Sequence, residues 1–456
     1  MDTSFDVKIR SIRIRKGVRK TSYVVRWTVN GDEFQDTLGT QALADSFRST
    51  LVTATRKGEA FSTITGLPDS LGSKASTVNW YDFAVQYVDA VWDQTAAHGR
   101  RSMAQALMKA TLALLRKEPH YEPVAVRRAL QQYAFNKNKR DSAPSDMKAM
   151  LAFIERNTLS MAAWEDPAKV DDVLTAMETR LDGKAVAASS RRRHRNVLSG
   201  IFDHAIKRGV LKTDPIPRGM RDRIKTSSTL DKRRLLNPEQ AQALLAWVHG
   251  QPRTGEILHA FFATMYYAGA RPEEVTALRV RDVTLPPEDA DDQWGELVFY
   301  EATPDVGSQW TDSGESYDKR HLKGRAEGDS RPVPCHPELT RILREEIRRR
   351  ELEPGDLILR AFKGGKLHTM VIKKMWYKAR KSVLTDDDMA FRKRVYDLRH
   401  TCLTTWLNSG IPPAQVAEWA GNSVPVLLRT YAHCIQGQFD HYKKRLEATH
   451  RLGGVA

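Results

Sequence analysis

The sequence predicts a mainly α-helical protein with small β-sheets, an α+β fold that divides into three domains. Three observations support this prediction. At 456 residues the chain is too long for one ordinary hydrophobic core. Apolar residues with helical spacing dominate from residue 79 onward. Alternating apolar and polar residues, which indicate strands, occur at the N-terminus and near 296–302 and 331–334.

Residues 1–60 are expected to form a small β-β-β-α module. Two stretches alternate apolar and polar side chains, as half-buried strands do: residues 8–16 and 22–38. Asn30-Gly31 within the second stretch is a strong signal for a tight hairpin turn. A helix over about residues 41–57 follows. The apolar residues spaced to pack this helix on the sheet are Ala44, Phe47 and Leu51.

The first strand of this module is strongly basic. Residues 8–20 contain seven lysines and arginines and no acidic residue. A sheet face of this charge suits a DNA groove, so we expect it to bind DNA. The candidate DNA-binding residues are Lys8, Arg10, Arg13 and Arg15. The alternative is a solvated edge strand whose charges prevent pairing with another chain.

Residues 61–78 are rich in Ser, Thr, Gly and Pro and predict a linker. A helical second domain is expected over residues 79–225. Two helical faces are predicted there, one from Phe83, Tyr87, Val88 and Val91 and one from Met103, Leu107, Ala110 and Leu114. Further helices are predicted near 145–157, 167–181 and 187–208.

The last of these helices places a basic cluster at its N-terminal end. Its expected core residues are Val197, Ile201 and Ala205, and its basic residues are Arg191, Arg192, Arg193 and Arg195. Cations oppose the helix dipole at this end. Neutralisation by DNA phosphates explains the arrangement, and a solvated run of charges is the alternative.

A third domain is expected over residues 226–436. The stretch 213–234 leading into it mixes Pro, Gly, Ser and basic residues, as an extended connection does. Asn237, Pro238 and Gln240 match the start of a capped helix, and the pattern stays helical to Gly269. After the two strands, the sequence predicts helices near 336–352 and 369–384 and then three closely spaced helices to about 434, followed by a tail over 437–456.

Composition favours a polyanionic partner. Lysine and arginine number 72 and aspartate and glutamate 56, so the formal charge is 72 − 56 = +16 and the sequence pI is about 9.7. Nucleic acid is the expected partner, because no apolar run reaches the length of a membrane-spanning helix. The N-terminus lacks the apolar core of a secretory signal, so we expect a cytoplasmic protein that associates with the nucleoid when bound to DNA.

Neither a metal nor another cofactor is expected. Cys335, Cys402 and Cys434 are too few and too scattered for a disulfide framework or a zinc site, and we expect them to be reduced. Cys434 is interpreted as a small apolar packing residue. His194 and His204 show no spacing typical of metal ligands.

Four residues in the last third of the chain have the chemistry needed to exchange phosphodiesters: Arg271, Lys323, Arg399 and Tyr431. Guanidiniums stabilise the charge that develops on the nonbridging phosphate oxygens. An ammonium can protonate a leaving 5′-oxygen. A phenol has an ordinary pKa near 10 and needs a proton acceptor or nearby cations to attack phosphorus.

Each of these residues alone also has a simpler interpretation. An arginine beside a capping acid, such as Arg271 with Glu274, is usually a surface pair. A lysine on a hairpin is usually solvated, and Lys319 or Arg325 are alternatives to Lys323. A single tyrosine on a helix usually packs against the core. The prediction therefore depends on the four residues as a set.

The segments around the four residues resemble the catalytic half of the tyrosine recombinases, the phage-integrase family. These segments are GARPEEVTAL, HLKGRAEGDSRPVP, YDLRHTCLTTWLNSG and WAGNSVPVLLRTYAHC. The resemblance implies that Arg271 and Arg399 clamp the scissile phosphate, that Lys323 is the general acid and that Tyr431 is the nucleophile. Glu274 matches the acidic residue that supports the first arginine.

The resemblance also implies an architecture and an activity. The expected order is an arm-type DNA-binding module at 1–60, a core-binding domain at 79–225, a catalytic domain at 226–436 and a tail at 437–456 that docks on a neighbouring subunit. The expected activity is site-specific recombination that integrates or excises a mobile element, such as a viral genome, through a 3′-phosphotyrosyl intermediate, without ATP or metal.

The implied partners are double-stranded DNA with core and arm-type sites, three further copies of the chain in a homotetramer, and DNA-bending or directionality proteins. A type IB topoisomerase-like enzyme is one alternative. A DNA-binding architectural or regulatory protein whose catalytic set has decayed is another.

Two positions depart from the family's usual sequence. Tyr396 stands where the family usually has His or Lys, and Asn422 where it usually has His or Trp. Neither side chain titrates near neutral pH, although both can hydrogen-bond a phosphate. His400 is the nearest titratable substitute, but its place beside Arg399 favours a structural role. The residue that accepts the Tyr431 proton is therefore left open by the sequence.

Overall fold

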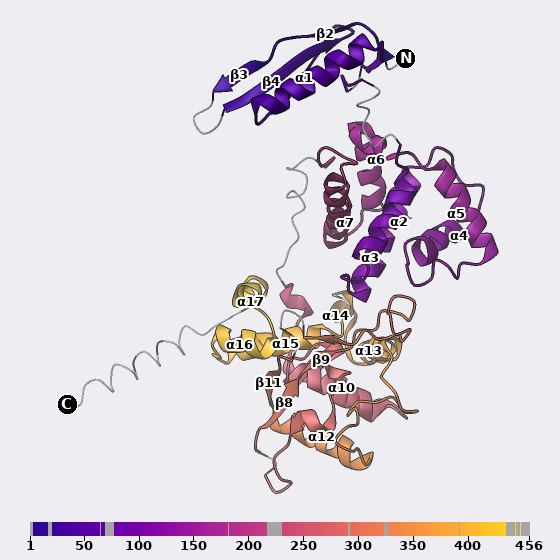
Figure 1. Cartoon of the computed structure of the whole chain (residues 1–456). Coiled ribbons are helices and arrows are strands. Elements are labelled where there is room, and N and C mark those ends of the chain that lie inside the picture. Colours follow the sequence, from indigo (N-terminus) through magenta and orange to yellow (C-terminus); the bar gives the residue numbers. More distant parts are fainter. Residues whose placement is uncertain are drawn as a thin grey trace. The chain divides into compact units, whose positions relative to one another are not determined.

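The computed structural model describes most of the chain, in two compact units, Met1–Lys225 and Thr226–Ala456 (Figure 1). The described residues are 3–16, 21–63, 65–68, 77–180, 182–216, 230–290, 292–322, 326, 328–391, 393–434, 443 and 447. Helices predominate, and the sheets are small and antiparallel, so the predicted α+β fold class is confirmed. None of the described helices is long and apolar enough to cross a membrane.

The N-terminal module is built around strand β4 (Thr21–Val29). Strand β5 (Asp32–Leu38) pairs along one edge of β4. The predicted turn between them is present, because Asn30 and Gly31 adopt φ values of 51° and 91°. Strands β2 (Val7–Ile9) and β3 (Arg13–Lys16) share the other edge of β4, so the predicted first strand is interrupted between them.

Helix α1 (Gln41–Arg56) covers one face of this sheet (Figure 1). Ala44 and Leu51 are buried, and Phe47 packs edge-on against Trp27 with ring centroids 5.6 Å apart. These are the helix residues that the sequence predicted to face the sheet. Short strands β1 (Thr3–Ser4) and β6 (Phe61–Ser62) pair beside it and extend the module into the predicted linker.

The residues from 77 to 216 that the structure describes form a helical bundle. Its elements are α2 (Trp80–Val91), α3 (Ala97–Ala113), α4 (Pro123–Ala129), the π-helical turn η3 (Leu130–Ala134), α5 (Ser145–Asn157), the 3₁₀ turn η4 (Met161–Glu165), α6 (Pro167–Glu178) and α7 (Ala188–Lys207). Trp164 lies at the centre of the core. Its ring centroid is 5.0 Å from that of Trp80 and 4.8 Å from that of Phe202.

Two core positions in this bundle differ from the prediction. In α7, Val197 is only half-buried, and Leu198 is fully buried with Ile201 and Ala205. The buried face of α7 therefore runs through His194, Leu198, Ile201 and Ala205, because spacings of three and four residues, rather than four alone, follow one side of a helix. In α2, Val91 is half-buried because it ends the helix.

The second unit begins with the 3₁₀ turn η5 (Lys232–Arg234) and helix α9 (Pro238–His249). The predicted cap of α9 is present: the Gln240 backbone N–H donates to Asn237 Oδ1 at 2.7 Å. The pattern that was expected to stay helical to Gly269 breaks after Gly250. Helix α10 (Gly255–Tyr267) then starts separately.

The rest of this unit contains three strands in one sheet and further helices around α10. The sheet has the order β11-β8-β7, from Arg331–Cys335, Gly295–Phe299 and Val283–Thr284, and the pair β9 (Glu301–Ala302) and β10 (Arg320–His321) lies apart from that sheet. The helices and turn are α11 (Pro272–Val275), η6 (Val280–Asp282), α12 (Pro337–Arg349), α13 (Thr369–Val383), α14 (Asp386–Ala390), α15 (Asp397–Asn408), α16 (Pro413–Ala420), α17 (Val424–Tyr431) and η7 (Ala432–Cys434).

Helix α10 is the centre of this unit, because it contacts α9, α12 and α15 and buries residues on all of its sides. The loop that follows α10 is therefore rigidly placed, and it carries Arg271. Cys335, Cys402 and Cys434 are buried in the hydrophobic core of this unit, which agrees with the packing role expected for Cys434. Residues 217–229 of the predicted basic connection at 213–234 and most of the tail at 437–456 lie outside the described residues.

Candidate active site

Three segments of the second unit bring most of the predicted site residues together. Arg271 and Glu274 come from the start of α11, and Arg399 and His400 come from the first turn of α15. The turn between α16 and α17 supplies Asn422, and α17 ends with Tyr431. Lys323 lies outside the described residues, so its place in the site stays a prediction.

Glu274 is the buried anchor of the site. Its carboxylate accepts hydrogen bonds from Arg271 Nη1 at 2.7 Å and from the Arg271 backbone N–H at 2.8 Å. Arg331 binds the same carboxylate in a bidentate manner, with Nη1 at 2.8 Å and Nη2 at 2.6 Å. Burial alone would raise the pKa of Glu274, but the two arginines, Arg331 above all, lower it to about 2.

Arg331 was missed by the sequence reasoning. It lies in β11 with its side chain 1% exposed and its guanidinium 4.9 Å from the centroid of the Phe299 ring. The strand offered a signal, since Arg331, Val333 and Cys335 alternate on one face and all three are buried. A charged residue in register with buried apolar residues requires a buried partner.

Both predicted arginines are fixed by the C-terminal end of α16. Arg271 Nη2 donates to the Gly421 carbonyl at 2.7 Å and to Asn422 Oδ1 at 3.1 Å. Arg399 Nη2 donates to the Ala420 carbonyl at 2.6 Å and to the same Oδ1 at 3.5 Å. Arg399 Nη1 also donates to the Gly269 carbonyl. Carbonyls at a helix C-terminus carry partial negative charge, so this end suits two cations.

Gly421 leaves no room for a larger residue at this point. It caps α16 in the left-handed conformation with φ 61°. A Cβ atom added there would lie 2.6 Å from Arg331 Nη1 and 3.2 Å from Arg271 Nη1. The two arginines thus approach the backbone closely, and glycine meets both the conformational and the steric requirement.

The phenol of Tyr431 is buried and contacts His400. Tyr431 is 3% exposed, and its Oη lies 2.7 Å from His400 Nδ1. Burial raises the pKa of Tyr431, and the charge of Arg399 opposes this effect. The sequence did not predict this direct contact between the His400 ring and the predicted nucleophile.

Charged groups surround the other side of the His400 ring. Asp397 Oδ1 lies 4.0 Å from His400 Nε2, and the Asp397 carboxylate accepts from Arg234 Nη2 at 2.7 Å and from the Arg394 backbone N–H at 2.6 Å. Burial, followed by the charges of Arg234 and Arg399, lowers the pKa of His400 to about 4. The imidazole is therefore neutral near pH 7.

Tyr396 packs beside both functional side chains. Its ring centroid is 5.1 Å from that of His400 in an edge-on arrangement and 5.9 Å from the Arg399 guanidinium carbon. Tyr396, at the position where His or Lys is usual in the resembling family, thus places an aromatic ring against both His400 and Arg399.

The basic candidates of the N-terminal module lie on an exposed face. Register pairs Lys8 with Thr28, Arg13 with Val24 and Arg15 with Ser22, all on the sheet face opposite α1. Arg10 forms an ion pair with Glu33 at 2.8 Å. This face therefore combines three exposed cations with one that has a protein partner.

The arginines of α7 divide into two groups. Arg191 Nη1 donates to Glu178 of α6 at 3.3 Å, and Arg195 Nε donates to the same carboxylate at 2.9 Å. One carboxylate from a neighbouring helix thus pairs with both arginines and compensates one of their two positive charges. Arg192 and Arg193 are exposed. Arg193 lines a groove with four other cations, Lys109, Arg127, Arg128 and Arg180.

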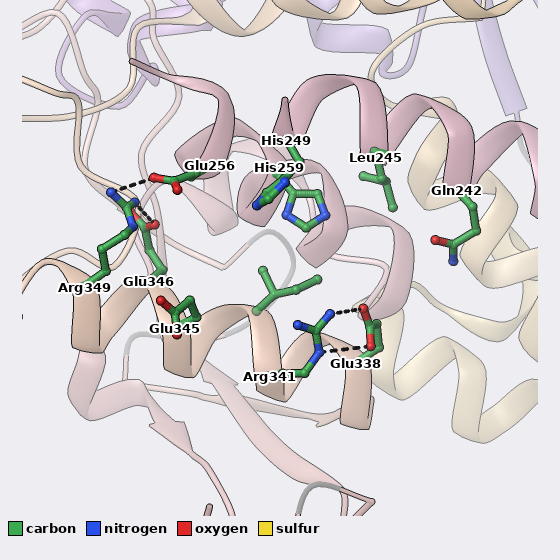
Figure 2. A pocket seen from close by; sticks show the side chains of 12 residues that line it. Gln242, Leu245, His249, Glu256, His259, Glu338, Arg341, Glu345, Glu346 and Arg349 are labelled. Atoms are coloured by element: carbon green, nitrogen blue, oxygen red, sulfur yellow. Dashed lines mark hydrogen bonds and ion pairs between the residues drawn. The ribbon is translucent and has the colours of Figure 1, made fainter. Parts of the chain in front are cut away.

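A separate cavity of about 320 Å³ lies between α9, α10 and α12 and holds none of the predicted site residues (Figure 2). His249 and His259 pack edge-on there with ring centroids 4.9 Å apart. Burial and the neighbouring His249 lower the pKa of His259 to about 4. The charged side chains that line this cavity pair with each other: Arg341 with Glu338 at 2.6 Å and Arg349 with Glu256 at 2.7 Å.

Part of the second unit matches a known protein family. Residues 234–436 match the phage integrase family. The chain is similar to the Tn1549 transposon integrase solved with transposon right end DNA, at 15% identity over 70% of this chain and 98% of that chain with a TM-score of 0.46. It is also similar to the XerH site-specific recombinase, at 14% identity over 77% of this chain and 98% of that chain with a TM-score of 0.42. No curated protein sequence gives a significant match.

We expect Gly421→Ala to destabilise the second unit more than Gly410→Ala. Both glycines have positive φ, 61° and 82°, so both substitutions strain the backbone by on the order of 1–3 kcal/mol. Only the Cβ at residue 421 would meet the arginines, whereas nothing lies within 4 Å of one at residue 410. Overpacking adds about 1–3 kcal/mol to the loss of stability in Gly421→Ala. Urea unfolding followed by tryptophan fluorescence measures the free energy of unfolding of both variants. Equal losses in the two variants would show that the arginines do not press on this position.

Proposed function

We propose that the chain is a tyrosine site-specific recombinase that cuts and rejoins duplex DNA through a 3′-phosphotyrosyl intermediate on Tyr431, since residues 234–436 match the phage integrase family. The observation that carries this proposal is the fixing of Arg271 and Arg399 around one atom, Asn422 Oδ1. Two guanidiniums held this close form a site for the two nonbridging oxygens of one DNA phosphate.

The two arginines stabilise the transition state. Charge increases on the nonbridging oxygens as phosphorus becomes five-coordinate, and donors that are already positioned need no reorganisation at that moment. Arg271 is held by Glu274 and Gly421, and Arg399 is held by Gly269 and Ala420. Asn422 therefore acts as a spacer between the two cations, in place of the family's usual His or Trp.

The covalent step exchanges one oxygen–phosphorus bond for another. Tyr431 Oη attacks the scissile phosphorus, the bond to the 5′-oxygen breaks, and the strand keeps its 3′-phosphate on the tyrosine. The leaving 5′-oxygen takes a proton from a general acid, for which Lys323 is the candidate. A 5′-hydroxyl of the partner strand then attacks the phosphotyrosine. The bond energy is conserved, so the step itself consumes no ATP.

DNA is proposed to bind along exposed cations in the first two parts of the chain. The module at 1–60 offers Lys8, Arg13 and Arg15 for arm-type sites, and the bundle at 79–225 offers Arg192 and Arg193 for core sites. The catalytic domain at 226–436 acts in a homotetramer, with the tail at 437–456 docking on a neighbour and DNA-bending or directionality proteins assisting. Integration and excision of a mobile element is the proposed biological reaction.

A covalent trap tests the chemistry. Wild-type protein and Tyr431→Phe are incubated in EDTA with nicked duplexes from DNA flanking the gene, and denaturant-resistant adducts are separated by size. We expect adducts with wild type only, because phenylalanine has no hydroxyl to attack phosphorus. The nick lets the short fragment with the new 5′-hydroxyl dissociate, so that it cannot attack the phosphotyrosine and reverse the cleavage. Tight DNA binding without an adduct would support the alternative of a DNA-binding protein without catalysis.

The salt dependence of DNA binding tests the N-terminal face. Each phosphate contact contributes about −0.9 to the log–log slope of affinity against salt, so Arg13→Gln/Arg15→Gln lowers its magnitude by about 1.8. Arg56→Gln/Lys57→Gln removes the same charge from the end of α1 and is the matched control. Arm-site duplexes in a fluorescence anisotropy titration give both slopes. If the two double variants change the slope equally, the sheet face has no special role.

A further inference from the structure

We propose that His400 is the proton acceptor for the Tyr431 hydroxyl during DNA cleavage, an inference that rests on the proposed function. Tyr396 and Asn422 leave the site without a titratable base at the family's usual positions. Among the residues that the structure describes, His400 is the side chain that hydrogen-bonds Tyr431 Oη, at 2.7 Å. That distance permits direct proton transfer.

The geometry indicates which nitrogen of the ring accepts the proton. His400 Nδ1 faces the phenol, and Nε2 faces Asp397 Oδ1 at 4.0 Å. A nearby carboxylate favours the tautomer that carries its proton on Nε2, which leaves the Nδ1 lone pair directed at Tyr431. Tyr396 packs edge-on against the same ring and limits its rotation. The arrangement of carboxylate, imidazole and nucleophile resembles other activated hydroxyl nucleophiles.

The charges around the ring keep it neutral until the reaction starts. Arg234 from η5 and Arg399 from α15 disfavour the imidazolium, and with burial they lower its pKa to about 4. The Asp397 carboxylate from α15 faces the ring with Oδ1 4.0 Å from Nε2, and Tyr431 from α17 and Tyr396 complete the surroundings. A neutral imidazole is the form that can accept a proton, so His400 is in the reactive state throughout the neutral range.

The proton balance of the step is complete. As the Oη–phosphorus bond forms, the phenolic proton moves to His400 Nδ1, and the 5′-oxygen departs with a proton from the general acid. The negative charge that accumulates on the phosphate oxygens compensates the new imidazolium. When the 5′-hydroxyl of the partner strand attacks the phosphotyrosine, its proton passes to the deprotonated general acid, the bond from phosphorus to Oη breaks, and the imidazolium returns its proton to Oη. The general acid and the His400 ring are then both restored.

Single-turnover cleavage of a nicked duplex measures the contribution of His400. We expect His400→Ala and His400→Gln to slow adduct formation by about 10²-fold or more, the usual effect of losing a positioned acid or base. The glutamine variant guards against a folding defect of the alanine variant. His259→Ala is the matched control, since His259 is also partly buried in the same unit and also has a pKa lowered to about 4. Duplex affinity and the unfolding midpoint are recorded for every variant.

Two further readouts separate a base from a merely structural histidine. A fluorinated tyrosine at residue 431 has a more acidic phenol and needs less help, so it restores much of the rate in His400→Ala. A duplex with sulfur in place of the bridging 5′-oxygen needs no acid for its leaving group, and it leaves the His400→Ala defect unchanged. Wild type shows a flat rate between about pH 6 and pH 8, whereas the His400→Ala rate rises about tenfold per pH unit with the tyrosinate fraction.

The outcomes separate this inference from the proposed function. If wild type forms adducts and the His400 variants cleave within about threefold of it, His400 is not the acceptor and the recombinase chemistry stands. A slow variant with a flat pH profile and no rescue by fluorotyrosine also overturns the inference, because it indicates a structural defect. If wild type forms no adduct on a duplex that it binds, the proposed function fails, and this inference fails with it.

Discussion

The rest of the active site depends on one buried carboxylate, that of Glu274. A carboxylate and a guanidinium with about 1% exposed side chains must neutralise each other, because an unpaired buried charge costs several kcal/mol. Glu274 satisfies this requirement for Arg331 with two bonds and still holds Arg271 with two more. Strand β11 and the loop after α10 are therefore locked together, and Arg271 projects from a fixed point.

Backbone carbonyls continue this organisation toward the nucleophile. Arg399 joins the loop after α10, through Gly269, to the end of α16, through Ala420. Asn422 Oδ1 then accepts hydrogen bonds from both Arg271 and Arg399, and α17 places Tyr431 against the first turn of α15. The two positions that differ from the resembling family's usual sequence, Asn422 and Tyr396, both make specific contacts. Asn422 lies between the two guanidiniums, and the Tyr396 ring packs against the His400 ring.

Local patterns predicted the elements well but not the contacts between distant segments. The Asn30-Gly31 turn, the Asn237 cap and the face of α3 depend on residues close together in the chain, and all are present. Arg331 lies 57 residues from Glu274, and His400 lies 31 from Tyr431, so no periodicity could have joined them. The pairing of Arg191 and Arg195 with Glu178 was missed for the same reason. Lys323 lies outside the described residues and stays a prediction of the family resemblance.

A double-mutant cycle on Glu274 and Arg331 tests this organisation most directly. Glu274→Gln, Arg331→Met and the double variant are compared with wild type in single-turnover cleavage of a nicked duplex and in urea unfolding. If one buried pair positions Arg271, each single variant is nearly as impaired as the double variant, with a coupling energy of about 2 kcal/mol or more. Additive losses in rate would contradict the dependence of Arg271 on this pair, and a single variant with the wild-type rate would contradict it more strongly.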